Sequence, residues 1–281
     1  MRKKLKPIVV IGFFLTFFAI IFISGVYGNR ATAGKETTIT QSNTNPTSIE
    51  TIPSSSYYIT NALEMKPIID VSAWQRLSEI DYDTLSQNIS GAIVRIQSGS
   101  HTKNENTATD ENGLDKAFDT HIKEFQARNI PVAVYAYVTG NSIDSMKEEA
   151  RSFYEAANKY NPTFYWLDVE EHTMDDMNGG VEAFRQELES LGAKNIGIYV
   201  GTYFMEDHSI NVDKFDAIWI PTYGVDSGYY NAAPSTDLDY DLHQYTSRGY
   251  VNGFENYLDL NIITTLKDPN EVYRKLFTTP E

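Results

Sequence analysis

Two acidic residues at the end of an apolar run are the clearest candidates for chemistry in this chain. The run PTFYWLDVEE at 162–171 contains Asp168 and Glu170, separated by a single valine. If residues 163–168 form a buried strand, side chains two positions apart share a face, so both carboxyl groups leave the strand on one side. Close carboxylates repel each other, which raises one pKa and leaves the other low. Glycoside hydrolysis uses such a pair.

The same residues also fit a structural alternative. Asp168 and Glu171 have the spacing of a helix capping box, in which the side chains only satisfy backbone N–H groups. This stretch alone does not decide between the two interpretations. The decision depends on the rest of the chain.

Composition excludes several classes of function. The chain has 281 residues and a formal net charge of −15, so it should be repelled by nucleic acid and by anionic lipid. Cysteine is absent, which excludes a thiolate metal site. The five histidines have no HxxH or HExxH spacing. We therefore expect no nucleic-acid partner, no metal and no organic cofactor.

The amino-terminal part predicts an export or anchoring segment followed by a linker. Four basic residues within the first six precede an apolar run at 8–26, which is long enough to cross a bilayer, and Ala31-Thr32-Ala33 offers a cleavage site. Residues 1–33 are thus a membrane anchor or a signal peptide, and either one places the remainder outside the cytoplasm. Residues 34–60 are rich in Ser, Thr and Asn and predict a flexible linker before a domain at 61–281.

Short apolar stretches alternate with amphipathic ones in the domain. Eight strands are predicted, at 67–71, 92–96, 131–137, 163–168, 196–200, 217–221, 242–245 and 257–260. Helices are predicted at about 114–128, 142–160 and 181–191, with Asn141 or Ser142 as the N-cap of the second. This alternation predicts an α/β fold, an irregular TIM-like (β/α) barrel of eight mainly parallel strands with few helices in its last third.

Acidic and aromatic residues stand at the carboxyl ends of these strands, where a parallel barrel places its active site. They are Asp70, Tyr135, Tyr137, Asp168, Glu170, Trp219, Tyr223, Gln244, Tyr245 and Asp259. Four carboxylates would then surround one mouth with aromatic walls. For Asp70 and Asp259, turn capping is the structural alternative. Tyr135 and Tyr137 share a face and either pack inside the barrel or contact a sugar.

Three other residues have structural interpretations. Trp74 and Trp166 are expected in the core, and Arg95 is expected to pair with an interior acid.

Five segments, in order, resemble the successive signatures of family 25 glycoside hydrolases, the Chalaropsis-type lysozymes. They are DVSAWQ at 70–75, WLDVE at 166–170, WIPTYG at 219–224, QYTSRG at 244–249 and DLN at 259–261. The resemblance covers about 66–265, which is nearly the whole predicted domain. One departure is His243, where the family commonly has tryptophan before Gln-Tyr. This change puts the details of sugar binding in doubt.

The resemblance implies hydrolysis of the β-1,4 bond between N-acetylmuramic acid and N-acetylglucosamine in peptidoglycan. We expect the protein to be a monomer. By motif position, Glu170 resembles the general acid, and Asp70, Asp168 and Asp259 resemble the other active-site carboxylates. Asp168 is the favoured partner of Glu170. An enzyme nucleophile, an activated water and a substrate-assisted route all remain open.

Three rival functions remain. A non-catalytic glycan-binding module would keep the aromatic groove but not need the acids. A polysaccharide deacetylase would need a metal held by histidine and aspartate. A calcium-dependent adhesion domain could use clustered acids as ligands, and chelation would then abolish its binding.

Overall fold

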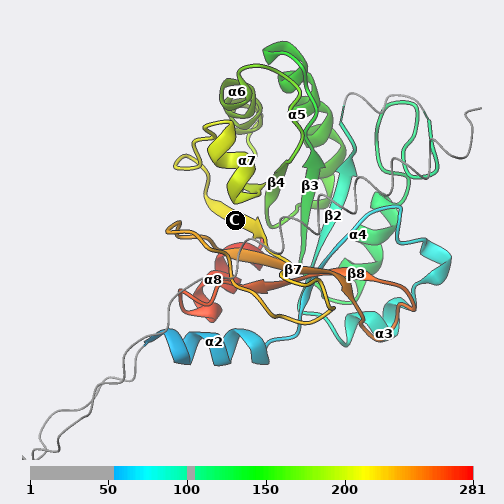
Figure 1. Cartoon of the computed structure of the whole chain (residues 1–281). Helices are drawn as coiled ribbons and strands as arrows, with labels where there is room; N and C mark the ends of the chain where they lie inside the picture. Colours follow the sequence, from blue (N-terminus) through cyan, green and yellow to red (C-terminus); the bar gives the residue numbers. More distant parts are fainter. Residues whose placement is uncertain (1–53, 100–104, 281) are drawn as a thin grey trace, which may run out of the picture. The chain divides into compact units, whose positions relative to one another are not determined.

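Eight strands form a closed barrel in the computed structural model, which describes residues 54–99 and 105–280 (Figure 1). They are β1 (Ile68–Val71), β2 (Gly91–Gln97), β3 (Val132–Tyr137), β4 (Tyr165–Val169), β5 (Ile196–Val200), β6 (Ala217–Pro221), β7 (Leu242–Gly249) and β8 (Leu258–Ile263). Strands β1 to β7 pair in parallel, whereas β8 is antiparallel to both β7 and β1. The predicted irregular barrel of eight mainly parallel strands is confirmed.

The predicted strands are all present, with shifted ends. The largest shift is in β7, which was expected to end at residue 245 and continues to Gly249. It extends because β7 and β8 form an antiparallel hairpin beyond the parallel part of the barrel, with register shifts between Gln244 and Thr246 and between Thr246 and Gly249. Such irregularities bend a strand and re-aim its side chains.

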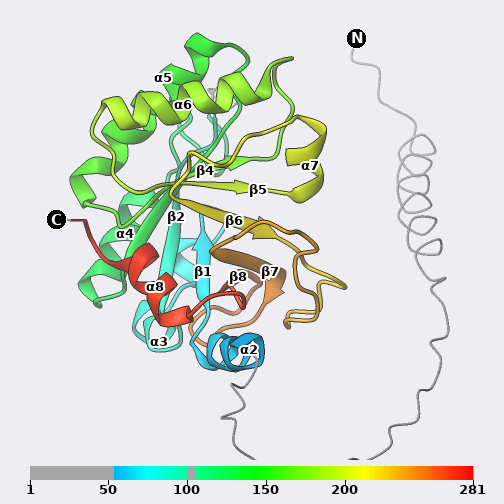
Figure 2. The ribbon, with the colours of Figure 1, turned by 90° about the vertical axis from the view of Figure 1, so that its left-hand side faces the viewer.

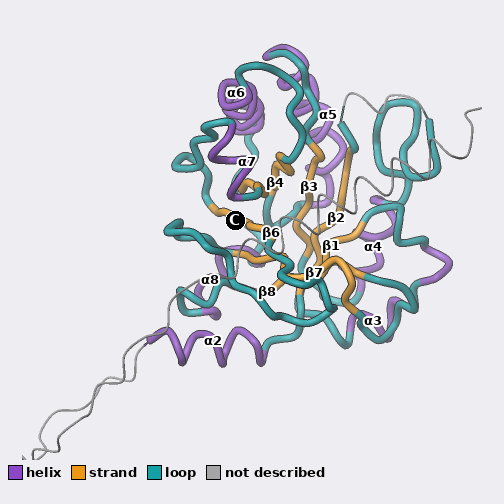
Figure 3. The backbone as a smooth tube through the Cα atoms, in the orientation of Figure 1, coloured by secondary structure: helices purple, strands orange, loops and turns teal. Residues whose placement is uncertain are grey.

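Helices cover mainly the side of the barrel formed by β2 to β5, as Figures 2 and 3 show. The predicted helices are α4 (Phe118–Ala127), α5 (Ile143–Ala157) and α6 (Met177–Ser190). In α5, Ser142 is the N-cap, as predicted, and forms a capping box with Ser145. Helices α5 and α6 pack on each other, each burying an apolar stripe of period 3.6.

The sequence prediction missed four helices. Two of them, α3 (Tyr82–Ser86) and α7 (Thr202–Asp207), are too short to show a helical period. Helix α8 (Pro269–Phe277) did carry a start signal, since Asp268 caps its first turn and proline occupies the first position. Its residues Val272, Leu276 and Phe277 join the cluster inside the barrel, so α8 closes the end opposite the carboxyl ends of the parallel strands.

Helix α2 (Ser54–Glu64) crosses the predicted boundary between linker and domain at residue 60. It contacts α8 and β8, and Ala62 is buried. The helix forms because it can pack against the barrel, which composition alone does not reveal. The predicted anchor or signal peptide at 1–33 and the predicted linker up to residue 53 lie outside the described residues. No helix at 54–99 or 105–280 is long and apolar enough to span a membrane.

The last third of the barrel is irregular, as expected. No helix lies between β6 and β7 or between β7 and β8 in the described chain, and loops surround these strands in Figure 3. Inside the barrel, Trp166 and Trp219 are both buried, with ring centroids 5.6 Å apart at 71°. The prediction that Trp166 lies in the core is confirmed. The same prediction for Trp74 is wrong, because its side chain is 62% exposed.

Candidate active site

A pocket of about 180 Å³ opens at the carboxyl ends of the parallel strands. Its lining residues are Asp70, Tyr135, Asp168, Glu170, Tyr199, Trp219, Tyr223, Gln244 and Asp259. The structure therefore brings together the four carboxylates that the sequence placed at the ends of three strands. Asp259 was expected at the carboxyl end of the eighth strand and lies instead near the amino end of β8, which reaches the same mouth because β8 is antiparallel. The volume is below the usual range for sites that enclose a drug-sized ligand, so the pocket can hold only a small part of a polymer.

Strand β4 and the residue that follows it carry two of the carboxylates. Trp166 and Asp168 alternate with outward-facing neighbours along the strand, and Glu170 follows directly after its end, so all three point to the interior side. The capping-box alternative is wrong. The next helix, α6, begins only at Met177, and its N-cap is Asp176, whose side chain accepts a hydrogen bond from Gly179 N at 2.8 Å.

Asp70 and Asp259 face each other across the antiparallel pair of β1 and β8, in direct register. Asp70 Oδ2 accepts hydrogen bonds from Gln244 Nε2 at 2.9 Å and Asn261 Nδ2 at 2.8 Å. Asn261 is itself oriented, because its Oδ1 accepts from Trp219 Nε1 at 2.8 Å. Asp70 is thus held by side chains of β7 and β8 and does not cap a turn.

Two tyrosines orient the amide of Gln244. Tyr199 OH donates to Gln244 Oε1 at 2.8 Å, and Tyr223 OH donates to the same oxygen at 2.5 Å. Because both donors occupy the oxygen side of the amide, its NH₂ group is directed at Asp70. The network is therefore a relay of hydrogen bonds from β5 and the loop after β6 to a carboxylate on β1.

The four carboxylates differ in exposure. Asp70 and Asp168 are buried, at 6% and 9% relative exposure, Asp259 is half-buried, and Glu170 is exposed at the rim. A substrate entering from solvent therefore meets Glu170 first. The aromatic rings of Tyr135, Tyr199 and Trp166 pack around Trp219 below the acids. This apolar floor makes ionisation of the carboxylates above it costly.

Burial raises the pKa of every carboxylate in the pocket, and the charges of neighbouring acids raise it further for Asp168, Glu170 and Asp259. Burial raises the pKa of Asp70 to about 6, although the bonds from Asn261 and Gln244 favour its charged form. Burial, and then the charge of Asp70, raise the pKa of Asp259 to about 8. Desolvation and the charges of Asp70 and Glu171 raise the pKa of Glu170. The cluster therefore retains protons at a pH where isolated carboxyl groups are ionised.

The surroundings of Asp168 strongly disfavour the charged form of its carboxyl group. Burial, followed by the charges of Glu170 and Asp70, raises its pKa well above the ordinary value, whereas Arg95 lowers it. Its Oδ1 atom is buried and has no hydrogen-bond partner among the described residues. A buried polar atom without a partner is destabilising, and sites of function tolerate this cost. Asp168 thus brings an unsatisfied acceptor into the wall of the pocket.

The other predicted contact residues divide into two groups. Tyr135, Trp219, Tyr223 and Gln244 line the pocket. Tyr137 lies beside it and donates a hydrogen bond from its OH to Glu171 Oε2 at 3.2 Å. Tyr245 does not line it and packs near the Tyr230 and His243 rings.

Sequence reasoning missed two members of the site. Tyr199 lies one residue before the end of β5, on the inward face. Asn261 was included only as the last residue of the DLN segment at 259–261, although it shares a face of β8 with Asp259 by the period of two. Alternation within the predicted strands could have found both residues.

The substitution at His243 changes packing outside the pocket. His243 is 1% exposed, and its Nε2 is 2.8 Å from the carbonyl oxygen of Thr222. Its ring packs near Tyr230, Tyr240 and Tyr245 on the outer face of β7. Gln244, the next residue, is the one that faces the carboxylates. The departure therefore leaves the lining of the pocket unaltered.

Arg95 pairs with an acid, as predicted. Its Nη2 lies 2.9 Å from Asp115 Oδ2, and its Nε donates to the same oxygen at 3.0 Å. Both side chains are largely buried. No group of three or more histidine, aspartate or glutamate side chains at 54–99 and 105–280 has an arrangement suited to a metal ion.

A closed barrel whose mouth holds several close carboxylates has the groups that glycoside hydrolysis requires. Residues 69–254 match the model of glycosyl hydrolases family 25, and the chain belongs to this family.

Solved structures agree with this membership. GHIP, a glycosyl hydrolase 25 of Streptococcus pneumoniae described as a virulence factor participating in host cell invasion, is 57% identical, with a TM-score of 0.75 over 80% of this chain and 98% of that one. The catalytic domain of endolysin ply40 from Listeria monocytogenes bacteriophage P40 is 25% identical, with a TM-score of 0.63 over 74% and 97% of the two chains. A bacterial lysozyme from Streptomyces coelicolor shares the fold at 18% identity, with a TM-score of 0.61 over 77% and 99%. No curated protein matches the chain.

Proposed function

We propose that this chain is a muramidase that hydrolyses the β-1,4 bond between N-acetylmuramic acid and N-acetylglucosamine in peptidoglycan outside the cytoplasm. The observation that carries the proposal is the pocket of four carboxylates, with Glu170 at its rim, in a barrel of family 25. The similarity to the catalytic domain of a phage endolysin supports peptidoglycan as the substrate.

Glu170 is the proposed general acid. It is the exposed member of the cluster, so the oxygen of a leaving sugar can reach it. Its pKa is raised by desolvation and by the charges of Asp70 and Glu171, which favours the protonated form that a general acid needs. A positioned acid with such a pKa contributes about 10²- to 10⁴-fold to a rate.

Asp168 is the proposed partner carboxylate. Its side chain lines the pocket, and its Oδ1 has no hydrogen-bond partner within the described chain, so the carboxyl group is not committed to another contact at that atom. The ionised form of Asp168 would stabilise the positive charge that develops on the sugar ring, because opposite charges attract each other strongly where water is excluded. On the opposite side of the pocket, the hydrogen bond from Gln244 holds the carboxylate of Asp70 in place.

The identity of the new reducing end tests the proposal. Residues 54–281 are incubated with purified peptidoglycan, with and without EDTA, and the products are reduced with borohydride and identified by mass spectrometry. We expect reduced N-acetylmuramic acid, unaffected by EDTA and absent with Glu170→Gln. Reducing ends on N-acetylglucosamine would contradict the assigned bond. Binding of the wall without new ends would instead indicate a glycan-binding module.

A further inference from the structure

Trp74 is the one exposed tryptophan among the three of the chain. Trp166 and Trp219 are 1% and 2% exposed, whereas Trp74 is 62% exposed. It lies in the loop after β1, four residues beyond Asp70, which lines the pocket. Tryptophan combines a large apolar ring with one N–H donor, so an exposed indole can bind a ligand that has both an apolar and a polar side.

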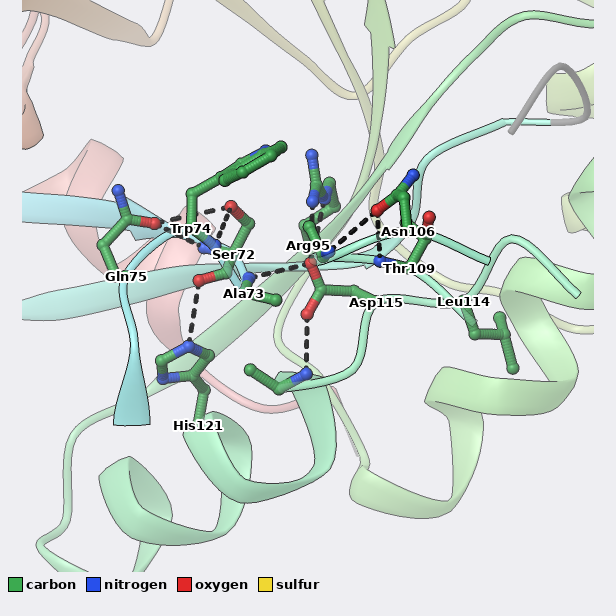
Figure 4. Close-up of polar contacts among 12 residues, drawn as sticks. Ser72, Ala73, Trp74, Gln75, Arg95, Asn106, Thr109, Leu114, Asp115 and His121 are labelled. Carbon is green, nitrogen blue, oxygen red and sulfur yellow. Dashed lines mark hydrogen bonds and ion pairs between the residues drawn. The ribbon is translucent and has the colours of Figure 1, made fainter. Parts of the chain in front are cut away.

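The loop that carries Trp74 is fixed by hydrogen bonds within the loop and to His121. The side chain of Gln75 turns back, and its Oε1 accepts from Ser72 N at 2.9 Å. Ser72 Oγ accepts from Trp74 N at 3.3 Å, and Ser72 O accepts from Gln75 N at 3.0 Å. The ring of His121, which is fully buried, places Nε2 3.1 Å from the same carbonyl oxygen. In Figure 4 the indole extends on the side of the loop away from His121.

Asp115 ties this loop to the barrel interior. Its Oδ2 accepts from Ala73 N at 2.9 Å and from Arg95 Nε at 3.0 Å, and its Oδ1 accepts from Ala117 N at 2.9 Å. Asp115 is 2% exposed, so these charge-assisted bonds are shielded from water. Figure 4 shows the guanidinium of Arg95 directed to the same side as the Trp74 indole. One buried carboxylate therefore couples the position of Trp74 to β2.

We propose that Trp74 is a sugar-binding platform, on which one pyranose ring of the glycan strand stacks outside the carboxylate pocket. This inference rests on the proposed muramidase function. The pocket of about 180 Å³ holds only a small part of the polymer, so neighbouring sugars must lie against the surface at the mouth. A pyranose presents C–H groups on its face and hydroxyl groups at its edge, which matches the apolar face and the N–H edge of an indole.

The rigid loop makes the platform effective. Because the backbone around Trp74 is fixed before binding, stacking costs little additional conformational entropy. Asp115 is the positioning residue, since it holds Ala73 next to the indole without contacting the sugar itself. A platform that contacts a sugar away from the scissile bond binds ground state and transition state equally, so its loss raises KM and leaves kcat nearly unchanged.

Steady-state kinetics on peptidoglycan test the platform with three variants of residues 54–281. Trp74→Ala should raise KM about tenfold with kcat within twofold, and Trp74→Phe should recover most of the loss. Leu266→Ala is the matched control. Leu266 is 51% exposed and follows β8, whose antiparallel direction places it at the opposite end of the barrel, so KM should not change. An unchanged KM in Trp74→Ala, while the parent cleaves the polymer, overturns the platform and leaves the muramidase intact.

Fluorescence separates binding from turnover. In the Glu170→Gln background, acrylamide should quench mainly Trp74, because the other two tryptophans are buried. Soluble peptidoglycan fragments should protect this fluorescence at concentrations that saturate binding. Bound fragments that leave acrylamide quenching unchanged overturn the proposal. If the parent protein itself releases no reducing ends, the muramidase function fails, whereas protection of Trp74 by fragments still supports the platform.

A double-mutant cycle tests the positioning role of Asp115. Asp115→Asn should raise KM when Trp74 is present and have little further effect on KM in Trp74→Ala. Equal effects in both backgrounds would show that Asp115 acts through another group, such as Arg95. Thermal unfolding of each variant identifies any loss that reflects folding alone.

Discussion

The two sides of the barrel place carboxylates at the same mouth in different ways. On the side of β2 to β5, parallel strands alternate with helices α4, α5 and α6, and strand alternation alone aims Asp168 inward. On the side of β6 to β8, loops replace helices and the last strand reverses direction. There, Asp259 reaches the mouth because β8 runs antiparallel, in register with Asp70. The regular side thus supplies the proposed acid and its partner, and the irregular side supplies the groups that adjust Asp70.

The largest expected effect comes from the regular side. Glu170→Gln should lower kcat at least a thousandfold on peptidoglycan, because the amide keeps the shape of the side chain but cannot donate a proton. The melting temperature should change little, since Glu170 is exposed. Reducing-end assays and calorimetry measure the two quantities. Activity within tenfold of the parent would remove Glu170 from the role of acid.

The irregular side is tested by Asp259→Asn, for which we expect a loss of about a hundredfold in kcat. Asp259 lies opposite Asp70 and lines the pocket, so its charge affects the other carboxylates. Full activity in this variant would mean that the irregular side only closes the barrel and contributes no catalytic carboxylate.

A smaller effect should follow from Gln244→Leu. This change removes one of the two hydrogen bonds that favour the charged form of Asp70, so the pKa of Asp70 should rise above about 6. The acidic limb of the plot of kcat/KM against pH should then move to higher pH, with about a tenfold loss at pH 5. An unshifted acidic limb would show that Asp70 does not set it.

The smallest effect concerns stability. Because the folded-state pKa values of Asp70 and Asp259 are raised to about 6 and about 8, the folded protein binds protons that the unfolded chain has lost above about pH 4. Their contribution to stability is therefore greatest at low pH and decreases as pH rises through these values. The melting temperature should be a few degrees higher at pH 5 than at pH 8.

Two variants sharpen the stability prediction. Asp168→Asn should raise the melting temperature at pH 8, because it removes a buried group whose ionisation is unfavourable. Glu182→Gln is the opposite control. Hydrogen bonds from Arg185 and Lys214 lower the pKa of Glu182 to about 2, so its loss should slightly lower stability at the same pH. A decrease for Asp168→Asn would show that its charge is compensated in the folded protein.

The sequence predicted the regular side more completely than the irregular one. The pattern of apolar residues located all eight strands, since burial on both faces leaves a clear apolar run. It also located Asp70, Asp168 and Glu170 at the carboxyl ends of their strands, because side-chain alternation is a local property. Asp259 was assigned to the wrong end of its strand, since the direction of β8 is not a local property. Helix α8 and the reversal of β8 were not predicted, because each depends on packing against parts of the barrel that are distant in sequence.

Local sequence therefore determined which residues could act, namely the acids and aromatics at the ends of strands. Only the tertiary structure decided how they act together. The bonds from Gln244 and Asn261 to Asp70 span 174 and 191 residues, and no local pattern encodes contacts of that separation. The exposure of Trp74 was likewise decided by the fold. An aromatic residue in a short loop fits a core or a surface equally well until a buried acid such as Asp115 fixes the loop at the mouth.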